Sequence, residues 1–213
     1  MKIVGVVGPA ESGKTSLIVS LIQELNRRRL RCGVFKKAEE EIELDPQGKD
    51  SQRFLQAGAN VAAVQTEEKF FLIKRESFVA SWLSLALEYF SEVDFVFIEG
   101  GKSLPDLKKI LVAQDPEALR LVEPKESIIA VVSEKTLSAS LPHFLPEKYA
   151  ELADFLLATV ADIEPVVRLK VNGQLVPLNP FVENMFQEIV AAMLRPLKGV
   201  PASFDTVSLL LKK

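Results

Sequence analysis

The chain has 213 residues, enough for one α/β domain with a buried core and roughly fifty residues of additional structure. Its 48% hydrophobic and 26% charged residues are typical of a globular protein, and its net charge of −3 gives no general attraction to nucleic acid or to acidic membranes. A single cysteine, Cys32, excludes an internal disulfide, and no stretch approaches the roughly 18 apolar residues that span a bilayer. We therefore expect a cytoplasmic protein without a nucleic-acid or membrane partner.

The first predicted element is the strand Lys2–Val7, and a glycine-rich loop follows it directly. The loop matches the pattern G-x-x-x-x-G-K-[ST] and consists of Gly8, Pro9, Ala10, Glu11, Ser12, Gly13, Lys14 and Thr15. In such a loop the backbone N–H groups and the N-terminus of the following helix bind phosphate oxygens, the lysine reaches the β- and γ-phosphates, and the hydroxyl binds Mg²⁺. We predict that these residues and Ser16 bind a nucleoside polyphosphate, with a catalytic role for Lys14 and a metal-binding role for Thr15.

Helices and strands alternate after the loop. The helix that the loop opens has apolar residues at a spacing near 3.6 and ends in Arg27–Arg29, a favourable place for cations. Further strands are predicted at Cys32–Lys36, Val61–Gln65, Asp94–Ile98, Lys109–Ala113 and Ile128–Ser133, and further helices at Gln52–Ala57 and Ser77–Phe90. This alternation predicts an α/β fold of the P-loop NTPase type, a mostly parallel sheet flanked by helices.

Several polar residues lie at the carboxyl ends of strands of this sheet, Lys36 and Lys37 among them, and should face one crevice with the glycine-rich loop, at the edge where ligands bind in such folds. Glu99 ends a buried strand, where P-loop proteins place the acid that orients Mg²⁺ or the attacking water. We predict a catalytic and metal-binding role for Glu99, acting through a water, with Gly100 beside the nucleotide; a helix-capping or loop-bonding carboxylate is the alternative. Ser133 begins a loop that is placed to meet a base edge. No N-K-x-D motif occurs, so these residues leave GTP and ATP both open.

The loop after the second strand carries Asp45 and Asp50. Loops in this place contact the metal and the γ-phosphate in many nucleotide-binding proteins, so both residues are candidates, Asp45 as a catalytic and metal-binding group. Either could equally be a turn residue, and Asp45-Pro46 has the sequence of an Asx turn.

The pattern of the last fifty residues predicts a separate small unit. Asn172-Gly173 is a strong hairpin signal between Val166–Val171 and Leu175–Val176, and Asn179 precedes a helix that starts at Pro180. A last strand is predicted at Val207–Leu211. We expect a nucleotide-binding domain at 1–163 and an α+β unit at 164–213. Its broad apolar helix face must dock on that domain, pair with another copy or receive a partner.

The sequence blocks resemble the molybdopterin-guanine dinucleotide biosynthesis protein B family of P-loop GTP-binding proteins. The resemblance is carried by Gly8–Thr15, Arg31–Lys36, Asp45–Arg53, Ala57–Ala59 and Asp94–Lys102. It implies that the chain binds GTP with Mg²⁺, hydrolyses it slowly and assists a partner enzyme that transfers GMP to molybdopterin. It further implies a place for Lys49 among the nucleotide-binding residues, and assembly as a homodimer.

The chain departs from the family in two places. Lys37–Glu41 stands where family members carry a histidine-rich stretch, and His143 is the chain's only histidine. Leu107–Ile110 approximates a Pro-Lys-Ile run without its proline. Two other functions therefore remain open: a P-loop small-molecule kinase, and a nucleotide-gated interaction module for another metallocofactor pathway.

Overall fold

The computed structural model describes residues 1–38, 50–74, 82–163, 167, 169–171, 174–176, 178–201, 203, 207 and 209. The chain divides into two compact units, Met1–Ala161 (the first unit) and Asp162–Lys213 (the second unit). Among the residues so described, none of the helices has the length and apolar character needed to cross a membrane.

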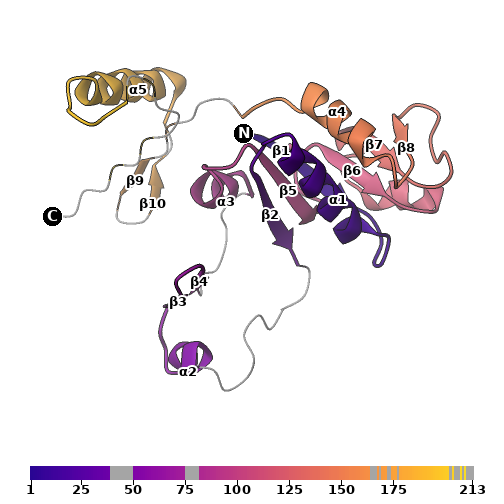
Figure 1. Ribbon diagram of the computed structural model, residues 1–213, viewed down its shortest axis with the longest axis horizontal. Helices are drawn as coiled ribbons and strands as arrows, with labels where there is room; N and C mark the ends of the chain where they lie inside the picture. The colour runs from indigo at the N-terminus through magenta and orange to yellow at the C-terminus, as the bar shows by residue number, and fades with distance from the viewer. Residues whose placement is uncertain are drawn as a thin grey trace. The chain divides into compact units, whose positions relative to one another are not determined.

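The first unit is built on a six-stranded sheet in the order β2-β5-β1-β6-β7-β8, and every neighbouring pair is parallel (Figure 1). Its strands are β1 Lys2–Val7, β2 Cys32–Lys37, β5 Phe95–Gly100, β6 Lys109–Val112, β7 Ile128–Val132 and β8 His143–Phe144. Strands β1, β5 and β6 are nearly continuous apolar runs because both faces of the sheet are covered at its centre. The predicted fold class, a mostly parallel sheet flanked by helices, is confirmed.

Helices α1 (Lys14–Arg27) and α4 (Tyr149–Thr159) cover one face of this sheet. The buried side chains that they contribute to the core are Leu17, Ile18, Leu21, Leu25, Leu152, Ala153 and Leu156, packed on alternate residues of β1, β5, β6 and β7. We predicted α1 but not α4, because Phe155, Leu156 and Leu157 are consecutive apolar residues that obscure the helical period.

The basic end of α1 is engaged in ion pairs. Glu24 accepts hydrogen bonds from Arg27 Nη2 and from Arg28 Nε, each at 2.7 Å. Arg28 also pairs with Asp154 of α4 and donates to the Ala150 carbonyl oxygen at 3.2 Å. These contacts join the C-terminal end of α1 to α4.

A buried lysine marks the opposite face of the sheet. Lys109 at the start of β6 is fully buried, and its Nζ donates to the carbonyl oxygens of Leu104 (2.7 Å) and Glu123 (3.0 Å) and to Ser127 Oγ (3.0 Å). Burial lowers the pKa of Lys109. Because an ammonium group has three protons to donate, these three acceptors satisfy it completely, and they tie the segment after β5 to the start of β7 (residues 128–132).

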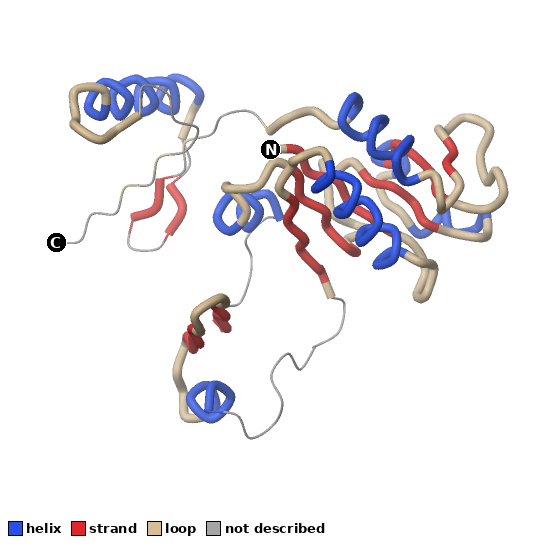
Figure 2. Tube along the Cα trace, viewed as in Figure 1, coloured by secondary structure: helices blue, strands red, loops and turns tan. Residues whose placement is uncertain are grey.

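Residues 50–74 form a small substructure of their own. It consists of α2 (Asp50–Gln56) and an antiparallel pair of strands, β3 (Val61–Gln65) and β4 (Phe70–Lys74), which Figure 2 shows as a short helix followed by two short strands. The prediction of Val61–Gln65 as a strand is confirmed, but β3 pairs with β4 and not with the parallel sheet. We did not predict β4. The helix predicted at Ser77–Phe90 is described as α3, Trp82–Tyr89, and residues 75–81 lie outside the described ranges.

The second unit contains a hairpin and one long helix. Strands β9 (Leu169–Val171) and β10 (Gln174–Val176) pair antiparallel, as predicted. Helix α5 (Pro180–Leu194) begins as predicted, because the Asn179 side chain accepts a hydrogen bond from the Val182 N–H at 3.0 Å. None of its side chains is buried. The last predicted strand, Val207–Leu211, lies mostly outside the described residues, and Val207 and Leu209, which are described, belong to no strand.

Candidate functional site

The order of the strands places a binding site at the carboxyl end of β1. From β1 the chain continues through α1 to β2 on one side of the sheet, whereas from β5 it continues to β6 on the other side. Connections that leave in opposite directions open a crevice outside the strand ends, where ligands bind in open α/β sheets. The glycine-rich loop occupies this position, between the end of β1 and the start of α1.

The loop is shaped by close backbone packing and by left-handed residues. A Cβ atom on Gly8 would lie 2.0 Å from the Val112 carbonyl oxygen, so only glycine fits between β1 and the end of β6. Glu11 and Gly13 have φ angles of 56° and 92°, which turn the chain sharply into α1. Gly13 is the residue that precedes α1 and has no side chain to cap it, so the first N–H groups of the helix are left for a ligand.

Ser12 supplies an independent sign that the loop binds a polar ligand. Its Oγ is buried and has no hydrogen-bond partner, the one such side-chain atom in the described ranges. A buried hydroxyl without a partner is costly, and proteins retain one where a ligand completes its bonding. A phosphate oxygen would be a suitable partner, so the loop fits the group that its sequence predicts.

Glu99 connects the loop to β2. It lies opposite Val6 of β1 and Lys36 of β2 in the sheet register. Its Oε2 accepts a hydrogen bond from Thr15 Oγ1 at 2.9 Å, and its Oε1 pairs with Lys36 Nζ at 3.3 Å. Within the described ranges the partners of Glu99 are thus side chains, not the backbone N–H groups of a helix start. The structure brings Thr15 and Glu99 into direct contact and adds Lys36, to which we assigned no role from sequence.

Positive charge gathers around this carboxylate. Burial lowers the pKa of Lys14, the Glu99 charge opposes that shift, and the charges of Lys102 and Lys36 lower the pKa further. The Lys14 ammonium group donates to the Pro9 carbonyl oxygen within the loop. The positive charges of Lys14, Lys36 and Lys102 thus outnumber the one carboxylate among the groups that act on Lys14, and such a field favours a polyanion such as a nucleoside triphosphate.

The remaining predicted site residues lie in different surroundings. Gly100 has a φ of 90°, and a Cβ there would lie 2.7 Å from the Lys37 carbonyl oxygen. Asp50 opens α2, where its carboxylate pairs with Arg53 at 3.6 Å. Ser133 is buried after β7, and its Oγ donates to the Lys135 carbonyl oxygen at 2.6 Å. Asp45 and Lys49 lie outside the described residues.

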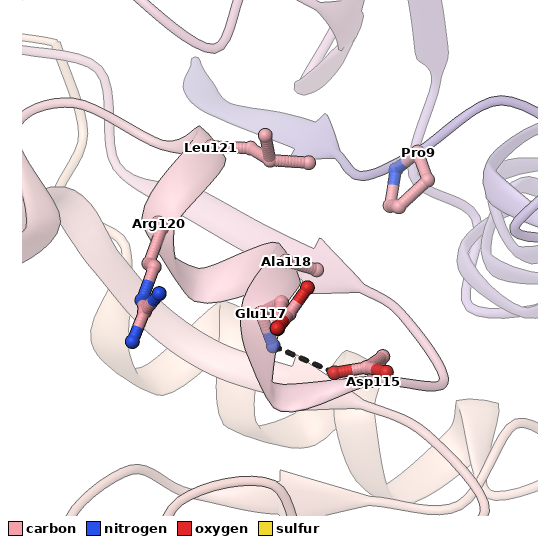
Figure 3. A pocket seen from close by; sticks show the side chains of 6 residues that line it. All are labelled: Pro9, Asp115, Glu117, Ala118, Arg120 and Leu121. Atoms are coloured by element: carbon pink, nitrogen blue, oxygen red, sulfur yellow. Dashed lines mark hydrogen bonds between the residues drawn. The ribbon is translucent and has the colours of Figure 1, made fainter.

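A hollow beside the loop was not predicted from sequence. It has a volume of about 420 Å³ and is lined by Pro9 of the loop and by residues of the 3-10 helix η1 (Pro116–Leu121) and its cap, as Figure 3 shows. The lining residues are Pro9, Asp115, Glu117, Ala118, Arg120 and Leu121. Asp115 accepts a hydrogen bond from the Glu117 N–H at 2.8 Å, so its carboxylate holds η1 in place. No motif signalled this hollow, because it forms where a loop after β6 meets the loop after β1.

The donor set suits a metal ion that is held partly by its nucleotide. In the described part of the chain no three histidine, cysteine, aspartate or glutamate side chains converge on one point. Mg²⁺ is usually bound by one or two protein oxygens together with phosphates and waters. Thr15 and Glu99, in hydrogen-bond contact, fit that mode of binding and would not form a metal site without the phosphates.

Comparisons with known proteins agree with this fold. The family model described as molybdopterin guanine dinucleotide synthesis protein B matches residues 3–134. A putative molybdopterin-guanine dinucleotide biosynthesis adapter protein of Methanocaldococcus jannaschii is 25% identical and covers 94% of this chain and 93% of its own length. The Haemophilus influenzae adapter protein is 29% identical and covers 72% of this chain and 86% of its own. The structure of Bacillus subtilis MobB matches with a TM-score of 0.61 at 28% identity, over 76% of this chain and 99% of that one. The chain therefore belongs to the molybdopterin guanine dinucleotide synthesis protein B family.

Proposed function

We propose that the chain binds GTP with Mg²⁺ at the glycine-rich loop, hydrolyses it slowly, and acts as an accessory protein in the attachment of GMP to molybdopterin. The observation that supports this most strongly is the Thr15–Glu99 hydrogen bond of 2.9 Å beside Lys14, in a loop whose Ser12 hydroxyl has no partner. A hydroxyl, a carboxylate and a lysine at this point are the groups that nucleoside triphosphate hydrolysis uses.

The roles of the residues follow the chemistry of phosphate and metal binding. Lys14 contacts the β- and γ-phosphates, Thr15 and Glu99 hold Mg²⁺ directly or through water, and Glu99 orients the attacking water. Mg²⁺ supplies neutralisation of the phosphate charge. Asp45 is proposed as a further catalytic and metal-binding group. The residues proposed to contact the nucleotide are Gly8, Pro9, Ala10, Glu11, Ser12, Gly13, Lys14, Thr15, Ser16, Lys49, Asp50, Gly100 and Ser133.

The proposed accessory role is supported by the names of related proteins. Proteins of Methanocaldococcus jannaschii and Haemophilus influenzae that match this chain are named adapter proteins of molybdopterin-guanine dinucleotide biosynthesis. An adapter acts on another protein, so we propose that this chain is cytoplasmic and assists a partner enzyme that transfers GMP to molybdopterin. Slow turnover of GTP suits such a role, because the partner performs the transfer.

We also propose that the chain is a homodimer to which the second unit contributes. Phe181, Ile189 and Met193 of α5 are 75%, 50% and 65% exposed, and Met185 on the same helix is exposed as well. Spacings of four residues place these side chains along one stripe of α5. A second copy that covers this stripe would remove it from water.

The phosphate-loop assignment is tested by calorimetric titration of the full chain with a non-hydrolysable GTP analogue. Lys14→Ala should weaken binding by about 30- to 1000-fold, because a charge-assisted contact to phosphate is lost. Lys108→Ala is the matched control, since this exposed lysine precedes β6 at the opposite end of the strands. Equal affinities for the Lys14 variant and the wild type would contradict the assignment.

A further inference from the structure

Lys36 is placed to meet the same ligand as Lys14, from the other side of Glu99. In the sheet order β2-β5-β1, the strand that carries Glu99 lies between the strand of Lys36 and the strand that leads into the loop. Two strand spacings, about 10 Å, separate β2 from β1. The carboxylate of Glu99 bridges this distance, since it bonds Thr15 Oγ1 at 2.9 Å and Lys36 Nζ at 3.3 Å. The Glu99 carboxylate alone therefore lies between the Lys36 ammonium group and the Thr15 hydroxyl, which is proposed to bind Mg²⁺.

The Lys36–Glu99 ion pair is poorly explained as a stabilising contact. The Lys36 side chain is 60% exposed, while that of Glu99 is 12% exposed. Ion pairs with one largely solvated partner contribute little to stability, and breaking one costs correspondingly little. Lys36 can thus exchange a single carboxylate oxygen for a more highly charged group that arrives next to Glu99.

The local charge favours that exchange. Lys36 Nζ lies 3.3 Å from Glu99 Oε1, and Glu99 Oε2 accepts a hydrogen bond from Thr15, the residue that follows Lys14. Two lysines therefore flank one carboxylate. A terminal phosphate adds negative charge at this point, whereas a nucleotide without one leaves Lys36 with the Glu99 carboxylate as its acceptor.

We propose that Lys36 recognises the terminal phosphate, so that the site distinguishes a nucleoside triphosphate from a diphosphate by a second lysine on β2. This inference rests on the proposed binding of GTP at the loop. Lys14 serves both nucleotides, because its reach includes the β-phosphate, whereas Lys36 serves the triphosphate only. The contact makes the strength of binding depend on whether the nucleotide has been hydrolysed.

Calorimetric titration of the full chain in Mg²⁺ with GDP and with a non-hydrolysable GTP analogue tests the proposal. Lys36→Gln should weaken binding of the triphosphate analogue by about 10- to 100-fold and leave GDP within about threefold, as expected for loss of one charge-assisted contact. Lys36→Arg should restore much of the preference. The matched control is Lys37→Gln, which removes the same charge from the next residue, whose side chain points to the other face of the strand.

The outcomes separate this inference from the proposed function. An equal loss for GDP and for the triphosphate analogue, or no difference between Lys36→Gln and Lys37→Gln, overturns the role of Lys36. If the wild type binds neither nucleotide, or if Lys14→Ala binds both normally, the proposed function fails as well. A thermal melt of each variant identifies any that has unfolded, and Lys36→Arg then provides the test in its place: a retained preference supports the proposal, and an equal loss for both nucleotides contradicts it.

Discussion

Helices with similar apolar patterns differ in burial between the two units. In the first unit, α1 and α4 bury their leucines against the six-stranded sheet. In the second unit, α5 buries none of its side chains, and Phe181 is 75% exposed. A wide sheet offers a helix a surface to cover, whereas β9 and β10 are only three residues long each. An amphipathic pattern thus predicts that one face of a helix is buried. Whether a neighbouring element of the same unit can bury that face depends on how large the element is.

The largest expected effect comes from removing the second unit. A chain that ends at Ala161 should lose the proposed dimer, so light scattering should find one chain where the full protein has two. Affinity for the GTP analogue should stay within about threefold, because every described residue of the loop lies in the first unit.

The full-length chain allows the same test by substitution. Ile189→Asn places an amide on the apolar stripe of α5 and should shift the protein towards one chain, whereas the exposed Lys198→Gln should not. A truncated chain that remains dimeric and soluble would show that the second unit forms neither an interface nor a core. The second unit would then be the surface to test for binding of the partner enzyme.

Within the first unit, Lys109 provides the strongest test of whether a buried, fully hydrogen-bonded group stabilises the core. Lys109→Met should lower the free energy of unfolding by about 3 kcal/mol, because three acceptors, two of them in buried residues, lose their donor. Lys108→Met changes the exposed neighbouring residue and should stay within about 0.5 kcal/mol of the wild type in urea unfolding. Equal stability of the two variants would mean that the buried ammonium group contributes nothing to the fold.

The chemistry proposed for the first unit is tested at Glu99. Glu99→Gln should slow GTP hydrolysis by about tenfold or more and leave nucleotide binding within a few-fold, because orienting the attacking water matters in the transition state. Glu126→Gln is an exposed control. A phosphate-release assay that finds normal turnover, or a variant that unfolds, would favour a structural role for this carboxylate.

The smallest effect concerns Glu24, which pairs with Arg27 and Arg28 at the C-terminal end of α1, where Arg28 also contacts α4. Hydrogen bonds from Arg27 and Arg28 lower the pKa of Glu24 from 4.5 to about 2. The folded protein therefore binds fewer protons than the unfolded chain in this window, so the stabilisation is complete above pH 4.5 and is lost as the pH falls towards 2. Glu24→Gln should lower Tm modestly at neutral pH, and the difference from the wild type should close in acid. A difference that stays constant across this range would contradict the ion-pair origin.

The parts of the candidate site that could be predicted from sequence are those that each lie within one continuous segment. The loop and Glu99 are recognisable because each follows a buried apolar strand, and the parallel sheet follows from the alternation of strands and helices. The sequence places Lys36 and Glu99 at one edge of the sheet, but their ion pair could not be predicted, since it depends on β5 lying next to β2, and the order of strands is a tertiary property. The burial of the Ser12 hydroxyl could not be predicted either, because burial is a property of the folded loop. Strand β4 was missed because Phe70–Ile73 is a short apolar run without a turn signal such as Asn-Gly beside it.

The function proposed for the first unit depends on the binding of GTP at its glycine-rich loop. The most direct test is a competition titration of the full chain with GTP and ATP in the presence of Mg²⁺. GTP should bind about tenfold more tightly or better, a difference of about 1.4 kcal/mol that two hydrogen bonds to the base edge can supply. Equal affinities for the two nucleotides would contradict guanine recognition, and an absence of binding by both would contradict the proposed function itself.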